Sequence, residues 1–283
     1  MRIIVSTETT VDLTKEIIEK HNIKIVPFTV LLGEEAGFDG EITPEMIFDF
    51  VDKTGTLPRT SAINEFTYTE FFEGLLKECD AVIHFSLSSQ LSSSYSNAVN
   101  AAKNFKNVHV IDSKSLSTGI ALQVLYACEL VKQGKDIKEI LECIEERKSY
   151  VQASFVVNTL SYLHKGGRCS GTTRFLGAIL RIKPQIIVTP EGKMEPGKKF
   201  IGRGVSVVKA YCEEVIKTYT NPDKSIVFLT HSHATPEMVE AARNVLIEHC
   251  FRNIVETVAG ATITSHCGPK TLGILFYNDG NIK

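Results

Sequence analysis

Six serine hydroxyls lie within nine consecutive positions of this chain. They are Ser86, Ser88, Ser89, Ser92, Ser93 and Ser94. Serine often caps a helix, but six serines in nine positions exceed what capping requires. Hydroxyls placed where a helix begins, beside free backbone N–H groups and the positive end of the helix dipole, suit a small anion. The run therefore predicts a site for a phosphate or a carboxylate.

Two further segments carry side chains suited to the same chemistry. His266 stands in Ser265-His266-Cys267-Gly268 and is the best candidate to face the serine run. In Gly166-Gly167-Arg168, glycines beside an arginine let backbone and guanidinium approach an anion or a partner closely. A tight turn with a solvated arginine has the same pattern, so this segment alone does not decide between the two.

Nucleophilic catalysis is a weaker alternative for the same residues. Ser92 and His266 could pair as nucleophile and base in a hydrolase or acyltransferase, but the chain lacks the G-x-S-x-G sequence of many serine hydrolases. A metal site of His231, His233 and His266 would have no accompanying carboxylate motif. We expect hydrogen-bonded loop histidines there, and no metal.

A nucleotide-binding loop is excluded. The segment 192–199 nearly has the spacing of a P-loop, yet Lys199 stands where a serine or threonine must reach Mg²⁺. Residues 190–193 instead predict a hairpin turn.

The serine run is positioned by alternating strands and helices in the first half of the chain. Expected strands cover 2–6, 81–85 and 108–112, and expected helices cover 13–21, 66–79, 95–105, 118–133 and 137–148. This alternation predicts a parallel sheet between helices, a three-layer α/β domain over residues 1–152, with ligands at the carboxyl ends of the strands. We expect 23–32 to be one extended segment and 57–62 to be a loop.

The second half mixes hairpins with helices, which predicts an α+β domain over residues 153–283. Expected strands cover 153–157, 185–189, 225–230, 254–258 and 273–277, and expected helices cover 205–219 and 235–249. The basic, glycine-rich stretch 163–174 is expected to be a loop.

Composition excludes several classes of protein. The 283 residues are 43% hydrophobic and 23% charged, with a net charge of −2, so nucleic acid is not an expected partner. No apolar run approaches the roughly 20 residues that span a bilayer. The seven cysteines are scattered without a C-x-x-C pair, which argues against disulfides and structural zinc. The start of the chain lacks a signal-peptide pattern, so a cytoplasmic protein is expected.

Several short motifs in this order resemble the DegV family of fatty-acid-binding proteins along essentially the whole chain. They are Thr9-Thr10-Val11-Asp12-Leu13, Thr60-Ser61, Ser88-Ser89-Gln90-Leu91-Ser92-Ser93-Ser94-Tyr95, Asp112-Ser113-Lys114, Lys165-Gly166-Gly167-Arg168, Lys183-Pro184 and Ser265-His266 followed by Gly268. The chain departs from the family pattern at Glu8, where aspartate is usual, at Ser93, where glycine is usual, and at Ala62-Ile63, where Gln-Pro is common.

The resemblance implies two α/β domains that hold one long-chain fatty acid, such as palmitate, at their interface. It implies a carboxylate site made by Thr60, Ser92 and His266, with Ser61, Ser93 and Ser94 beside it. Arg203 would lie near the head-group and Arg168 would face a partner. That partner would be the ATP-binding subunit of a bacterial fatty acid kinase, which makes an acyl-phosphate for phospholipid synthesis.

Elementary energetics agree with such a role. About 14 buried methylenes at ~0.8 kcal/mol each give ~11 kcal/mol before the costs of association, whereas an unpaired buried carboxylate would be costly. Hydroxyls and an imidazole at one end of an apolar tunnel would supply the hydrogen bonds that such a carboxylate needs. We therefore expect a non-catalytic fatty-acid-binding protein without a cofactor. A Ser92–His266 hydrolase and a sensor of phosphorylated ligands are the alternatives.

Overall fold

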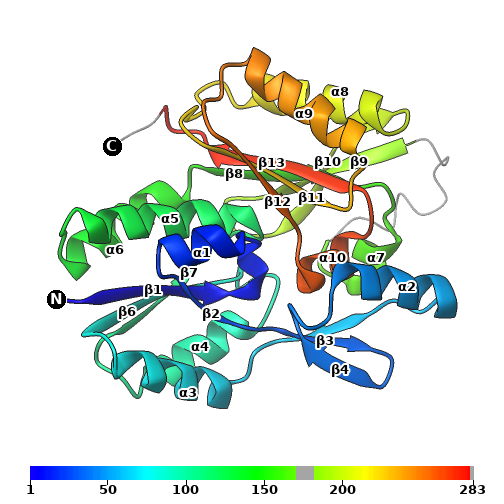
Figure 1. The fold of residues 1–283 in the computed structure, drawn as a ribbon. Helices are drawn as coiled ribbons and strands as arrows, with labels where there is room; N and C mark the ends of the chain where they lie inside the picture. The colour runs from blue at the N-terminus through cyan, green and yellow to red at the C-terminus, as the bar shows by residue number, and fades with distance from the viewer. Residues whose placement is uncertain (170–181, 281–283) are drawn as a thin grey trace.

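The N-terminal half is built on a parallel four-stranded sheet. The computed structural model describes residues 1–169 and 182–280 (Figure 1). The sheet has the order β2-β1-β6-β7. Its strands are β1 (Ile3–Glu8), β2 (Lys24–Val26), β6 (Ala81–Ser86) and β7 (Val108–Asp112). Every residue of β6 is buried, as a central parallel strand covered on both faces requires.

Helices cover both faces of this sheet, which confirms the expected three-layer arrangement (Figure 1). On one side lie α1 (Lys15–Lys20), α5 (Thr118–Lys132) and α6 (Ile137–Lys148); on the other lie α3 (Glu65–Leu76) and α4 (Ser94–Ala102). A 3₁₀ turn, η1 (Thr9–Val11), follows β1. Side-chain caps fix where two of these helices begin: Asn64 caps α3, and Asp136 forms a capping box with Glu139 on α6.

The C-terminal half is a mixed six-stranded sheet of order β10-β9-β8-β13-β11-β12. Its strands are β8 (Val151–Val156), β9 (Ile182–Val188), β10 (Met194–Ile201), β11 (Val227–Ser232), β12 (Ile254–Val258) and β13 (Thr271–Tyr277). Helices α8 (Val205–Thr218) and α9 (Pro236–Glu248) cover its outer face, and α5 packs against the opposite face (Figure 1). We expected the division after residue 152; β8, which begins at Val151, already belongs to this second sheet.

A small antiparallel sheet of order β4-β3-β5 was not expected from the sequence. It consists of β3 (Thr29–Leu32), β4 (Glu35–Phe38) and β5 (Arg59–Ser61). Two predictions were wrong here. Residues 23–32 are not one strand, because the chain leaves the parallel sheet at Pro27 and enters the small one. Residues 57–62 are not all loop, because Thr60 pairs with Val30.

Two short helices complete the fold beside α2 (Pro44–Thr54), namely α7 (Ser161–Gly166) and α10 (Ala261–Cys267). Helix α7 lies in the stretch expected to be a loop, so that prediction was wrong for its first residues; positions 170–174 of the stretch lie outside the described residues. The hairpin predicted at 190–193 is confirmed between β9 and β10. Gly192 supplies the positive φ of +86° that this turn needs.

Candidate functional site

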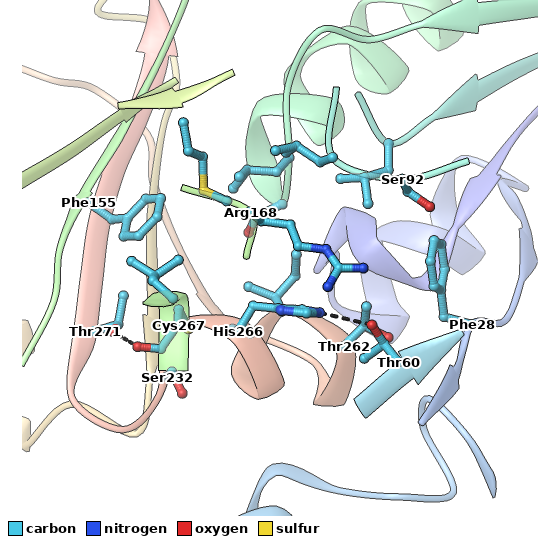
Figure 2. A pocket seen from close by; sticks show the side chains of 18 of the residues that line it. Phe28, Thr60, Ser92, Phe155, Arg168, Ser232, Thr262, His266, Cys267 and Thr271 are labelled. Carbon is cyan, nitrogen blue, oxygen red and sulfur yellow. Dashed lines mark hydrogen bonds between the residues drawn. The ribbon is translucent and has the colours of Figure 1, made fainter. Parts of the chain in front are cut away.

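A cavity of about 460 Å³ lies between the two halves of the chain. Its walls are largely apolar, with Leu87, Leu91 and Leu116 from the N-terminal half and Phe155, Leu163 and Leu275 from the C-terminal half. In Figure 2, Thr60, Ser92 and Phe28 lie on one side of the cavity, whereas Phe155, Ser232 and Thr271 lie on the opposite side. The site is therefore an apolar chamber with polar side chains at both ends.

The serine run contributes to the cavity through two of its members. Ser92 and Ser93 line the cavity, and Ser94 does not. Ser94 is fully buried at the start of α4, where its Oγ accepts from the backbone N–H of Ile63 at 3.2 Å and from Ser92 Oγ at 3.1 Å. Ser93 has a φ of −78°, a conformation open to any residue, so serine stands without backbone strain where the family usually has glycine.

Glu8 holds the start of the serine run from the core of the N-terminal domain. Its carboxylate accepts from Leu87 N at 2.8 Å, and from the hydroxyls of Ser86 and Tyr68 at 2.5 Å each. Glu8 is completely buried, and a buried carboxylate is tolerated only when its oxygens are satisfied in this way. The position of Leu87, a wall residue of the cavity, is thus set by an acidic side chain in the core.

His266 lies in the last turn of α10 and points across the cavity toward β5 (Figure 2). Its Nε2 lies 2.8 Å from Thr60 Oγ1. Nδ1 has no hydrogen-bond partner among the described residues. Gly166 closes off that side of the ring, because a Cβ at position 166 would lie 2.7 Å from Nδ1. Burial, and secondarily the charge of Arg168, lowers the pKa of His266 from 6.5 to about 4, so the imidazole is neutral at physiological pH.

This lowered pKa predicts a dependence of stability on pH. Between pH 6.5 and about 4, the unfolded chain binds a proton at residue 266 that the folded chain does not. The contribution of His266 to the free energy of unfolding therefore falls as the pH decreases through this window. Urea denaturation at several pH values should show the stability of the wild type relative to His266→Ala decreasing toward acid pH. A difference that stays constant would contradict it.

The two arginines singled out from the sequence lie in different places. Arg168 is exposed, lines the cavity, and donates from Nη1 to the carbonyl of Gly166 at 2.5 Å. Arg203 is exposed and is not a lining residue. Partial burial of Lys183, and secondarily the charge of Arg203, lowers the pKa of Lys183. A role of Arg203 near a head-group stays a prediction.

The structure adds a lining residue that the motifs did not indicate. Thr262 stands four positions before His266 on α10, so both side chains lie on one face of the helix. Its Oγ1 is buried and has no hydrogen-bond partner among the described residues. The i, i+4 spacing from His266 was the signal in the sequence that would have found it.

The far end of the cavity is lined by hydroxyl groups that are already hydrogen-bonded. Thr230 Oγ1 contacts Thr118 Oγ1 at 2.6 Å and Thr257 Oγ1 at 2.9 Å. Ser232 Oγ contacts Thr264 Oγ1 at 3.1 Å, and Thr271 Oγ1 donates to the carbonyl of Cys267 at 2.8 Å. These groups differ from Thr262 in having their partners within the protein.

The part of the chain that the structure describes gives little support to a metal site or to serine-nucleophile catalysis. No cluster of three or more His, Cys, Asp or Glu residues suited to a metal ion is found there; His231 pairs with Glu256 and His233 with Glu45. Ser92 hydrogen-bonds to Ser94 while His266 hydrogen-bonds to Thr60, so no Ser92–His266 dyad is formed. None of the helices over the described residues is long and apolar enough to cross a membrane.

Comparison with known proteins identifies the family and the fold. The model of a family described as uncharacterised proteins of the DegV family matches residues 2–279. The chain belongs to the DegV family. Protein DegV of Bacillus subtilis is 30% identical over 283 residues, covering 97% of this chain and 98% of that protein.

Solved structures of DegV proteins share this fold over nearly their whole length. A DegV family protein of Thermus thermophilus, described by its fatty acid binding, superposes with a TM-score of 0.89 at 29% identity, covering 98% of this chain and 99% of that one. DegV of Bacillus subtilis, described as a fatty acid binding protein, gives a TM-score of 0.83 at 28% identity, with 98% and 99% covered. The α/β architecture expected from the sequence is therefore confirmed.

Proposed function

We propose that this DegV protein binds one long-chain fatty acid in the cavity between its two halves. The observation that carries the proposal is the apolar chamber with Thr60, Ser92 and His266 gathered at one end. The likeness to DegV proteins described as binding fatty acids supports it. The hydrocarbon chain lies against the leucine and phenylalanine walls, and burial of its methylenes at ~0.8 kcal/mol each provides most of the affinity.

The carboxylate is held by hydroxyl donors, one of which is oriented by the imidazole of His266. Because Nδ1 of His266 is buried without an acceptor, a proton there would be an unsatisfied donor, so the proton resides on Nε2 and is donated to Thr60 Oγ1. The Thr60 hydroxyl is then free to donate to a carboxylate oxygen. Ser93 adds a further hydroxyl donor from the cavity wall, and Arg168 supplies positive charge at the same cavity. The hydroxyls of Ser61 and Ser92 donate to Ala62 O and Ser94 Oγ, and each would have to rotate toward the carboxylate to bind it.

The bound acid is presented to a separate kinase, and this chain performs no chemistry of its own. Its sequence lacks a nucleotide-binding loop, so ATP would arrive with the partner. Arg168 is both exposed and a lining residue. A residue so placed can contact the head-group and a docked protein together. Arg203, exposed elsewhere on the C-terminal half, is the second candidate for a head-group or partner contact.

Native mass spectrometry of the recombinant protein tests the proposed ligand. We expect the purified protein to carry one fatty acid per chain, and the delipidated protein to take up palmitate or oleate at the same stoichiometry. A protein that is isolated without lipid and takes up neither acid would refute the proposal. Displacement of the lipid by a phosphorylated metabolite would instead favour a phosphate-ligand sensor.

Thr262→Val tests whether the unpartnered hydroxyl belongs to the head-group site. Valine keeps the shape of threonine and removes a donor that the protein itself leaves unused, so fatty-acid affinity should fall about threefold to tenfold. The stability of the lipid-free protein should not fall, because a buried unsatisfied group is removed. Isothermal titration with oleate and urea denaturation measure the two effects.

Thr69→Val is the matched control, because that threonine lies on α3 and donates within its own helix to Glu65 O at 2.9 Å. It should leave the affinity unchanged. If Thr262→Val raised the affinity, the hydroxyl would face the hydrocarbon chain and would be excluded from the head-group site.

A further inference from the structure

Three consecutive backbone N–H groups at the start of α10 donate to two aspartate side chains from the other half of the chain. Asp12 Oδ1 accepts from Gly260 N at 2.8 Å. Asp39 accepts from Ala261 N through Oδ1 at 2.8 Å and from Thr262 N through Oδ2 at 3.0 Å. The first N–H groups of a helix have no partners within it, so these bonds satisfy donors that α10 cannot satisfy itself.

The packing at this contact is tight. Asp12 and Asp39 are only 6% and 8% exposed. A Cβ at position 260 would lie 3.0 Å from Asp39 Oδ1 and 3.3 Å from Asp12 Oδ1. Gly260 has an ordinary φ of −66°, so the glycine allows the close approach of the two aspartate side chains and is not required by an unusual backbone conformation.

Asp39 and Thr60 are set by the same small sheet. Asp39 directly follows β4, and Thr60 lies on β5, with β3 paired to both strands. Helix α10 has seven residues, too few to be stable without tertiary contacts. Ala261 packs in a cluster with Val30 of β3 and Ile47 of α2. The place of α10 relative to Thr60 is therefore fixed from the small sheet, at the helix start.

We propose that Asp39, assisted by Asp12, is a positioning residue of the head-group site: it fixes the start of α10 so that His266 and Thr262 face Thr60 across the cavity. This inference rests on the proposed function for its effect on affinity. The two aspartates belong to the N-terminal half and the imidazole to the C-terminal half, so the site is complete only when the halves are docked. Burial of Asp12, opposed by its bonds to Ser117 and Gly260 and reinforced only weakly by Asp39, raises its pKa to about 8.

Asp39→Asn keeps the shape of the side chain but turns an amide N–H toward a backbone donor, so one of the two bonds is lost. We expect oleate affinity to fall about tenfold. If Asp39 acts through His266 and Thr262, the same substitution in a His266→Ala Thr262→Val background should change affinity by less than about twofold. An equal loss in both backgrounds would overturn the proposal, because it would show that Asp39 acts independently of these two residues.

A second variant and a control separate positioning from general stability. Gly260→Ala places a methyl group against the carboxyl oxygens of Asp12 and Asp39. It should lower oleate affinity, as Asp39→Asn does, while leaving both aspartates in the chain. Asp136→Ala removes a side-chain cap from α6, where Asp136 Oδ1 accepts from Glu139 N at 2.9 Å. It should lower the thermal midpoint without changing affinity. Wild-type affinity in Gly260→Ala and in folded Asp39→Asn would refute the proposal.

¹⁵N NMR of the His266 imidazole in the lipid-free protein tests the positioning role of Asp39 without the proposed ligand. In the wild type we expect the neutral form protonated at Nε2, and in Asp39→Asn a shift of the Nε2 resonance as the contact with Thr60 loosens. This readout needs no fatty acid. Failure of the wild type to bind oleate would therefore refute the proposed function, whereas an unchanged His266 resonance in Asp39→Asn would refute the positioning role.

Discussion

Replacing His266 by alanine should weaken fatty-acid binding about 10- to 100-fold, the loss expected when a hydrogen bond that supports a buried charged group is removed. The variant loses the Nε2 contact at 2.8 Å that orients the Thr60 hydroxyl. Nothing else in the described part of the chain hydrogen-bonds to this ring, so the fold should survive. Titration with oleate measures the affinity, and circular dichroism verifies the fold.

His249→Ala is the control for this substitution, because that histidine pairs with Glu213 at 3.0 Å on the outer helices and does not line the cavity. It should bind oleate as the wild type does. His266→Asn should recover part of the lost affinity if an N–H group, rather than positive charge, is what the site needs. Wild-type affinity in folded His266→Ala would remove the residue from the site.

Replacing Arg147 by methionine should cost about 3–5 kcal/mol of stability, the usual penalty for leaving buried charges without their partner. Arg147 on α6 contacts Asp223 at 2.9 Å and Asp279 at 2.6 Å, and both aspartates belong to the C-terminal half. Its guanidinium also lies 3.9 Å from the ring centroid of Tyr277, an arrangement that adds a cation–π contribution. Urea denaturation should show a large shift of the midpoint.

Lys138→Met on the same helix is the matched control. Lys138 pairs with Glu142 at 3.9 Å, and the side chains are 84% and 63% exposed. Such surface pairs contribute ~0–1 kcal/mol, so the midpoint should hardly move. Equal stability losses in the two variants would show that the buried network does not hold the halves together.

The architecture was predictable because its signals are local. Strand and helix alternate along the first half, and β6 is a short apolar run interrupted only by His84. The small sheet gave no such signal: β5 has three residues, follows Pro58, and pairs with a strand about 30 positions earlier. Its pairing depends on tertiary contacts that a short segment cannot encode alone.

Prediction of the site was limited in the same way. A motif places residues on the chain, but it does not say which hydroxyl faces a cavity. Ser94 and Ser92 are two positions apart in the serine run, yet Ser94 is bonded to Ile63 N and Ser92 lines the cavity. The contacts of Asp39 with α10 span 222 and 223 positions, and neither aspartate nor helix carries a local pattern that indicates the other.

The internally bonded hydroxyls at the far end of the cavity have a consequence for the hydrocarbon tail. The hydroxyl oxygens of Thr230, Ser232 and Thr271 are already hydrogen-bonded within the protein. They therefore do not need water molecules as partners, and the methyl end of a fatty acid can pack against them. Residues that a hydropathy scale counts as hydrophilic can thus form part of the wall around a hydrocarbon chain. Replacing one member of such a pair, rather than the wall residue itself, would be enough to make that end of the chamber wet.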